Sequence, residues 1–277
     1  MSATGLFRIA WRQIWQKPGI LVMAFWYLII TSLFQLFVLS RLGASLPSSL
    51  THLGLQNVAS PHLPHIAPGV LAKVVLVYLT LGLIILPFVI GGLYGGAAEA
   101  VRGQEPLAGL FSFFKFGRHN FWRTFTLVVM AFIGFIILFL ILMAVSLLLS
   151  LAGRAIPAIA PVFSVIALIV LIGLMMLWFA TLLYWVGAVF YGQVTPGEGL
   201  KEALRWIQKH WPFGLRFVLL EAALLIIFML VMLLVAQIPL LGGLLALIVS
   251  GIMLAWIAYQ AMFLYRESIR NDIKPPV

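Results

Sequence analysis

The chain of 277 residues has no cysteine and few charged side chains: 9% of its residues are Asp, Glu, Lys or Arg, against about 25% in soluble proteins. Without cysteine there is no disulfide, no thiolate nucleophile and no cysteine-ligated metal. Only seven residues are acidic, and they form no Ser/His/Asp or metal-ligand cluster. The sequence therefore predicts no enzyme, no cofactor and no metal site.

Apolar residues are in large excess and predict a membrane protein. Hydrophobic residues make up 64% of the chain, against roughly 45–50% in soluble proteins. The formal charge of +10 does not indicate a nucleic-acid partner, because the basic residues lie between the apolar runs. In those places lysine and arginine act as topology signals and contact anionic lipid headgroups.

Six apolar runs are each long enough to cross the ~30 Å hydrocarbon core of a bilayer. They predict an all-α polytopic protein with six transmembrane helices. Pro87 lies inside the second run and predicts a kink. The runs cover residues 18–40, 70–102, 125–150, 161–191, 217–236 and 239–265.

The lysines and arginines alternate between the two sides of these runs. Lys73 and Arg102, at the two ends of the second run, are counted with the connections beside them. The N-terminus, the second and fourth connections and the C-terminus then carry 3, 4, 4 and 3 of them, whereas the first, third and fifth connections carry 2, 1 and 0. By the positive-inside rule both termini are predicted to be cytoplasmic.

A repeated junction organises the chain into one membrane domain of three parallel units. Gly5, Gly109 and Gly199 are each followed by leucine, and thirteen residues later an apolar run is about to begin. We expect each unit to be a cytoplasmic amphipathic helix followed by a transmembrane hairpin. The predicted units are residues 1–104, 105–194 and 195–277.

The junctions Arg102-Gly-Gln-Glu-Pro and Gly192-Gln-Val-Thr-Pro each place a glycine-containing turn before a basic amphipathic helix. In this the chain resembles bacterial six-span integral membrane proteins of uncharacterised function, including the membrane region attached to some glycerophosphodiester phosphodiesterases. The resemblance implies a multi-pass protein of the bacterial cytoplasmic membrane. It implies no activity, because the phosphodiesterase catalytic domain is missing.

The amphipathic stretches predict contacts with lipid. Thr195 and Glu198 have the spacing of a capping box at the start of the third stretch. The basic residues of the three stretches are either ligands for anionic headgroups or part of a cytoplasmic collar that orients the hairpins. They are Arg8, Arg12, Lys17, Lys115, Arg118, Arg123, Lys201, Arg205 and Lys209.

Two charge pairs recur at the same position of the repeat. Glu99 with Arg102, and Glu267 with Arg270, have the i, i+3 spacing that allows a bridge along one helix. They form either local bridges or a cytoplasmic gate between helices.

Glu221 is the most informative single residue. It lies within the fifth apolar run, five residues past Arg216, and therefore about 7 Å deeper along a helix at ~1.5 Å per residue. A carboxylate at that depth faces a cavity or a partner, or else it pairs with a basic residue near the interface. Other polar side chains of the spans either line a polar path with it or hold helices together: Gln35, Thr181, Tyr184, Tyr259 and Gln260.

Small residues after Pro87 predict close helix packing, within the bundle or across a dimer, with a flexible hinge as the alternative. They are Gly91, Gly92, Gly95 and Gly96. A histidine metal site in the first connection is disfavoured by the prolines around His62 and His65.

Two functions remain open. The first is transport, or the handling of a lipid or amphiphile, through a cavity between the repeats. The second is a scaffold or accessory subunit of a membrane complex, and a homo-oligomer is compatible with either. The asymmetric Glu221 favours the first.

Overall fold

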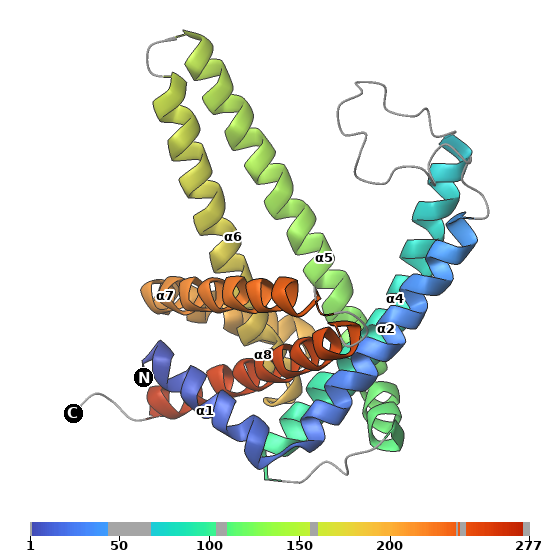
Figure 1. Ribbon diagram of the computed structural model, residues 1–277. Coiled ribbons are helices and arrows are strands. Elements are labelled where there is room, and N and C mark those ends of the chain that lie inside the picture. Colours follow the sequence, from blue (N-terminus) through green and yellow to red (C-terminus); the bar gives the residue numbers. More distant parts are fainter. Residues whose placement is uncertain are drawn as a thin grey trace.

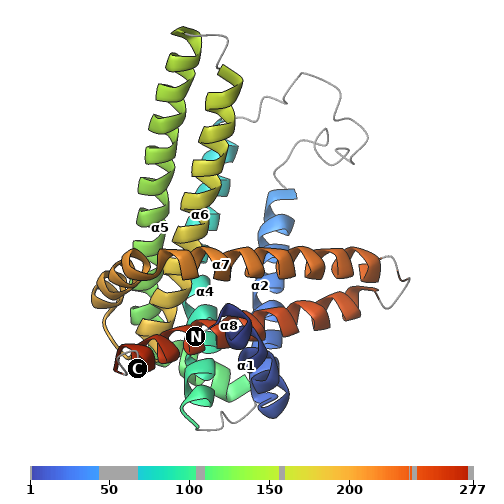
Figure 2. The same cartoon turned by 90° about the vertical axis from the view of Figure 1, so that its left-hand side faces the viewer.

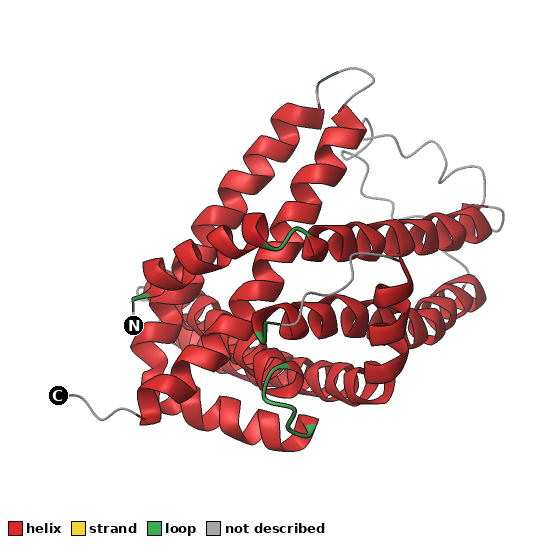
Figure 3. Ribbon diagram, turned by 90° about the horizontal axis from the view of Figure 1, so that it is seen from below, coloured by secondary structure: helices red, strands yellow, loops and turns green. Residues whose placement is uncertain are grey.

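The computed structural model describes residues 2–43, 68–103, 110–155, 160–236, 238 and 242–273. Within these ranges the chain forms seven helices and no strand (Figure 3), so the fold is all-α, as the composition predicts. The helices are α1 (Ala3–Gln16), α2 (Gly19–Gly43), α4 (Pro68–Val101), α5 (Leu110–Ala155), α6 (Ala160–Phe190), α7 (Pro196–Ala236) and α8 (Gly242–Ile273).

Five helices are long and apolar enough to cross a membrane. These stretches are Gly82–Val101, Phe111–Leu148, Leu168–Phe190, Pro196–Val235 and Gly242–Arg270. A sixth is reached if α1 and the described part of α2 are taken together as one broken span, although the two meet at 92°. In the part of the chain that the structure describes, the number of candidate spans is therefore five or six by length and composition.

The long helices form three hairpins that diverge from a common base. Helix α2 runs beside α4, α5 beside α6 and α7 beside α8, and each pair points in its own direction (Figures 1 and 2). The C-terminal ends of α4, α6 and α8 lie at the base, together with α1.

The buried core sits in this base. It is formed by α1, the start of α2, the C-terminal halves of α4, α6 and α8, and the first halves of α5 and α7. The outer halves of the hairpins expose large apolar side chains such as Phe139 at 50%, Ile169 at 64% and Leu234 at 71%. Apolar faces of that extent are rare on soluble monomers and suit a lipid environment.

Two breaks in the helices lie beside prolines. Pro18 separates α1 from α2, and α7 bends at His210, two residues before Pro212. At the corresponding place in α5 stands Trp122, and α5 continues through it as one helix of 46 residues. The separate amphipathic helix and span expected there are thus one continuous helix. No proline in α5 removes a backbone N–H donor, so nothing interrupts the helical hydrogen bonds.

The glycines of α4 bring it close to two neighbours. A Cβ added at Gly95 would lie 2.6 Å from Nδ2 of Asn120 on α5, and one added at Gly92 would lie 2.7 Å from the ring of Phe113. Gly96 meets the sulfur of Met23 on α2, and Gly91 faces α5 as well. Helix α4 continues through Pro87, and its glycine face packs inside this chain.

The predicted capping box is present at the start of α7. The Thr195 hydroxyl and backbone N–H donate to Oε2 of Glu198 at 2.7 and 3.2 Å, and the Glu198 N–H donates to Oγ1 of Thr195 at 3.3 Å. These hydrogen bonds lower the pKa of the Glu198 carboxyl. The resulting stabilisation is present above the ordinary carboxyl pKa and is lost as the pH falls through the lowered value.

Candidate functional site

Beyond its bend, helix α7 turns one stripe of side chains toward the core. Phe217, Glu221, Leu224 and Phe228 follow each other at helical spacing and all pack into or against the core. Glu221 is 0% exposed. The carboxylate is therefore enclosed by the protein.

Helix α8 presents the opposite wall. Trp256 and Gln260 lie one turn apart and are 3% and 0% exposed. The ring of Phe7 lies 5.3 Å from that of Trp256 and 5.4 Å from that of Phe217, and Phe228 lies 6.0 Å from Trp256. These ring contacts place the α7 stripe against Trp256 and its neighbours on α8.

Five buried polar atoms along this contact have no hydrogen-bond partner. They are both carboxylate oxygens of Glu221, the indole N–H of Trp256 and both amide atoms of Gln260; we call these three residues the polar seam. Buried polar atoms are nearly always paired, and each unpaired one costs about 1–3 kcal/mol. Here five of them lie on three residues of the contact between α7 and α8.

The polar groups that interact with the Glu221 carboxylate are uncharged. The Gln260 amide lies close enough to the Glu221 carboxylate to interact with it, although the two groups are not in hydrogen-bonding geometry. Tyr94 of α4 is within electrostatic range of both Glu221 and Tyr27. Among the described residues, none forms an ion pair with Glu221.

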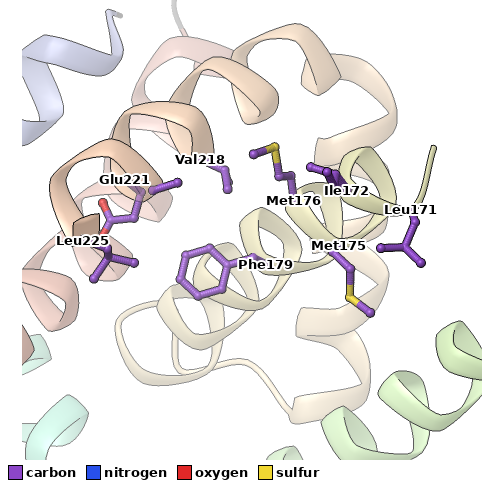
Figure 4. Close-up of a pocket in the computed structure, with 9 residues that line it drawn as sticks. Leu171, Ile172, Met175, Met176, Phe179, Val218, Glu221 and Leu225 are labelled. Atoms are coloured by element: carbon purple, nitrogen blue, oxygen red, sulfur yellow. The ribbon is translucent and has the colours of Figure 1, made fainter. Parts of the chain in front are cut away.

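An apolar groove of about 360 Å³ lies between α6 and α7, directly beside the seam (Figure 4). Figure 4 shows the α7 side chains Val218 and Leu225 on one wall and Phe179 with Met176 on the other. Glu221 lines the groove, but its carboxylate points away from the two methionines. The remaining lining residues are Leu171, Ile172, Met175 and Ala222.

Three of the polar residues predicted to accompany Glu221 have other partners. The Thr181 hydroxyl donates to the Leu177 carbonyl at 2.7 Å, and the Tyr259 hydroxyl contacts the Lys17 carbonyl at 3.4 Å. Tyr184 stacks on Trp206 at 4.7 Å and accepts a hydrogen bond from Ser268. The side chain of Gln35 lies outside the described residues.

Of the three residues of the polar seam, the sequence indicates Glu221 and Gln260 as candidates and does not indicate Trp256. Its only signal is the spacing of four residues from Gln260, which puts both on one face of a helix. The spacing alone does not show that this face of the helix lies against α7.

Arg102 forms its predicted bridge and also joins two hairpins. Its Nη1 lies 2.8 Å from Oε1 of Glu99, and its Nη2 donates to the carbonyls of Phe190 and Tyr191 at 3.0 and 2.6 Å. These carbonyls close α6 and lack helical partners. Arg102 is therefore a cap at the negative end of the α6 dipole.

The second pair is a local bridge. Oε2 of Glu267 lies 3.9 Å from Arg270, while Oε1 lies 2.8 Å from the neighbouring Arg266. Both contacts stay within α8.

Two of the basic residues predicted to touch lipid bind the protein itself. Lys17 donates to the Ala100 carbonyl at 2.7 Å, and Arg123 donates to Oε1 of Gln193 at 2.6 Å. The others have exposed side chains: Arg8, Arg12, Lys115, Arg118, Lys201, Arg205 and Lys209.

The part of the chain that the structure describes contains no group of three residues able to hold a metal ion. His52, His62 and His65 lie outside it. In comparisons with known proteins, no family model, curated protein or solved structure matches this chain.

Proposed function

We propose that this protein is a transporter-like membrane protein that binds an amphiphile, with its polar head at the polar seam and its apolar chain in the α6–α7 groove. The observation that carries the proposal is the set of five unpaired polar atoms on Glu221, Trp256 and Gln260. If these positions served only for packing, apolar side chains would avoid the cost of unpaired polar atoms. A binding site, in contrast, needs hydrogen-bonding groups that are free. No enzymatic step is part of the proposal.

The groove suits the apolar part of such a molecule. Its volume of about 360 Å³ holds roughly twelve groups the size of a water molecule, at ≈ 30 Å³ each. Two methionines and Phe179 line it, and methionine adapts to apolar chains of varied shape. Glu221 belongs to both the groove and the seam, so it marks where chain and head would meet.

The proposed setting is the bacterial cytoplasmic membrane, with six spans in three parallel units and both termini in the cytoplasm. The alternation of lysine and arginine between the connections supports this orientation. The base of the structure would then face the cytoplasm, and the tips of the hairpins would face the other side.

Anionic lipid headgroups are the proposed partners of the base. Exposed aromatic side chains stand beside the exposed basic residues, among them Trp11 at 44%, Phe111 at 89% and Trp122 at 74%. Aromatic rings beside lysine and arginine are typical of a helix in the headgroup region.

The alternative is a scaffold within a membrane complex or a homo-oligomer. The divergence of the three hairpins favours it, because their outer halves have few partners within the chain (Figure 1). In that case the exposed apolar faces would bind another membrane protein.

Filling the groove tests the function. Ala222→Trp places an indole in the groove, whereas Met229→Trp adds the same indole two turns further along the same face of α7, where the side chain is 65% exposed. We expect Ala222→Trp to weaken binding of dodecyl amphiphiles at least about tenfold, equivalent to ~1.4 kcal/mol, and Met229→Trp to leave it unchanged.

Native mass spectrometry of the purified chain, titrated with dodecylamine, dodecanol and dodecanoate, gives the affinities. The proposal is supported if at least one probe binds saturably and if this binding is lost in Ala222→Trp but kept in Met229→Trp. Failure of all three probes to bind, or equal effects of the two tryptophans, would favour the scaffold.

A further inference from the structure

The hydrogen-bonding groups of the polar seam contain more acceptors than donors. Its three unpaired oxygens belong to Glu221 and Gln260, and its two unpaired nitrogens belong to Gln260 and Trp256. An ionised carboxylate can only accept hydrogen bonds. A guest that fits the seam must therefore bring N–H or O–H donors.

The charge of the seam favours a cation. The Glu221 carboxylate has no basic partner among the described residues, and Arg216, five residues earlier on the same helix, is exposed at the base. The polar groups of other helices that interact with it are the uncharged Tyr94 on α4 and Gln260 on α8. An ionised buried carboxylate needs a cation beside it.

Aromatic side chains near the carboxylate favour an organic cation over a metal ion. Trp256 belongs to the seam and Tyr94 lies within electrostatic range of Glu221. Faces of tryptophan and tyrosine attract ammonium groups. A metal ion, in contrast, would require further oxygen ligands besides these three unpaired oxygens, and the seam supplies no others.

We infer that the head recognised here is a protonated amine, so the ligand class is an ammonium-headed amphiphile. The inference rests on the proposed function and specifies its substrate. The ammonium group donates to the oxygens of Glu221 and Gln260 and neutralises the carboxylate. Its apolar chain leaves along the stem of Glu221 into the groove.

The test compares three heads on one chain and one substitution in the seam. Dodecylamine, dodecanol and dodecanoate are titrated into the wild-type protein and into Glu221→Gln, and native mass spectrometry gives each affinity. Glutamine keeps the size of the side chain and removes its charge. Thermal unfolding of both proteins checks that the variant folds.

We expect dodecylamine to bind at least about tenfold more tightly than dodecanol, and dodecanoate to bind most weakly. Glu221→Gln is expected to abolish the preference for the amine and to leave dodecanol binding within about twofold. If dodecanol or dodecanoate binds as tightly as the amine, or if the preference survives in Glu221→Gln, the ligand class is wrong while the groove function stands. If no probe binds, both proposals fail together.

If Glu221→Gln fails to fold, the same titrations with Gln260→Leu provide a second test. It removes an acceptor and leaves the carboxylate in place. Weakened dodecylamine binding with unchanged dodecanol binding supports the inference, and equal binding of both probes overturns it.

Discussion

Glu221→Leu is expected to make the folded protein more stable and to remove its ammonium site. Both carboxylate oxygens are buried without a partner, and leaving such a group unpaired costs about 1–3 kcal/mol. Leucine has a similar volume and no polar atom. The free energy of unfolding should therefore rise by about 1–3 kcal/mol, while dodecylamine binding falls to the level of dodecanol.

Thermal unfolding of wild type and variant in the same detergent measures the first effect. Leu219→Ala serves as the matched control, because Leu219 lies two residues away on α7 with its side chain 54% exposed. A lower melting temperature for Glu221→Leu would mean that the carboxylate has a stabilising partner, and the seam would then be a structural element.

Gly187→Ala is expected to destabilise the base. A Cβ at this position of α6 would fall against the carbonyl oxygen of Ala261 on α8 and lie 2.8 Å from the Cβ of Tyr265. The first contact is with backbone, so the two helices must move apart. Overpacking of this kind costs about 1–3 kcal/mol.

Gly173→Ala on the same helix is the control. A Cβ there meets nothing within 4 Å, and alanine stabilises an open helical position by up to about 1 kcal/mol relative to glycine. Thermal unfolding should therefore separate the two variants in opposite directions. Equal melting temperatures would mean that α6 and α8 do not cross at Gly187.

Much of the helix layout is predictable because proline and composition determine it. Pro18 ends a helix by its missing donor, and the 64% of hydrophobic residues fixes the class. The continuity of α5 was not predicted, since the repeated junction predicts a separate amphipathic helix before each apolar run. At that place in α5 stands Trp122, which cannot break a helix. The bend of α7 lies at His210, two residues before Pro212, so the proline gives its approximate place but not the residue at which it occurs.

The site is only partly predictable for a physical reason. In an amphipathic helix such as α1, apolar spacing identifies the buried face, and Leu6, Ala10 and Ile14 are indeed buried. The spans α6 and α8 are apolar on most sides, so periodicity does not reveal which side faces the core. Glu221 was recognisable because a carboxylate is rare at that depth, whereas Trp256 was one aromatic residue among many.

The central claim is that the polar seam admits a guest, and cysteine labelling tests it most directly. The chain has no cysteine, so Gln260→Cys is the single reactive site in its variant. Ala258→Cys on the same helix, where the side chain is 0% exposed, reports on the dry core. Lys201→Cys on the exposed side of α7 reports on full access.

With the protein in vesicles, a membrane-impermeant maleimide is expected to label Gln260→Cys more slowly than Lys201→Cys but at least about tenfold faster than Ala258→Cys. Dodecylamine should protect Gln260→Cys from labelling. Labelling of Gln260→Cys as slow as that of Ala258→Cys, with Lys201→Cys fully reactive, would show a sealed seam and contradict the account.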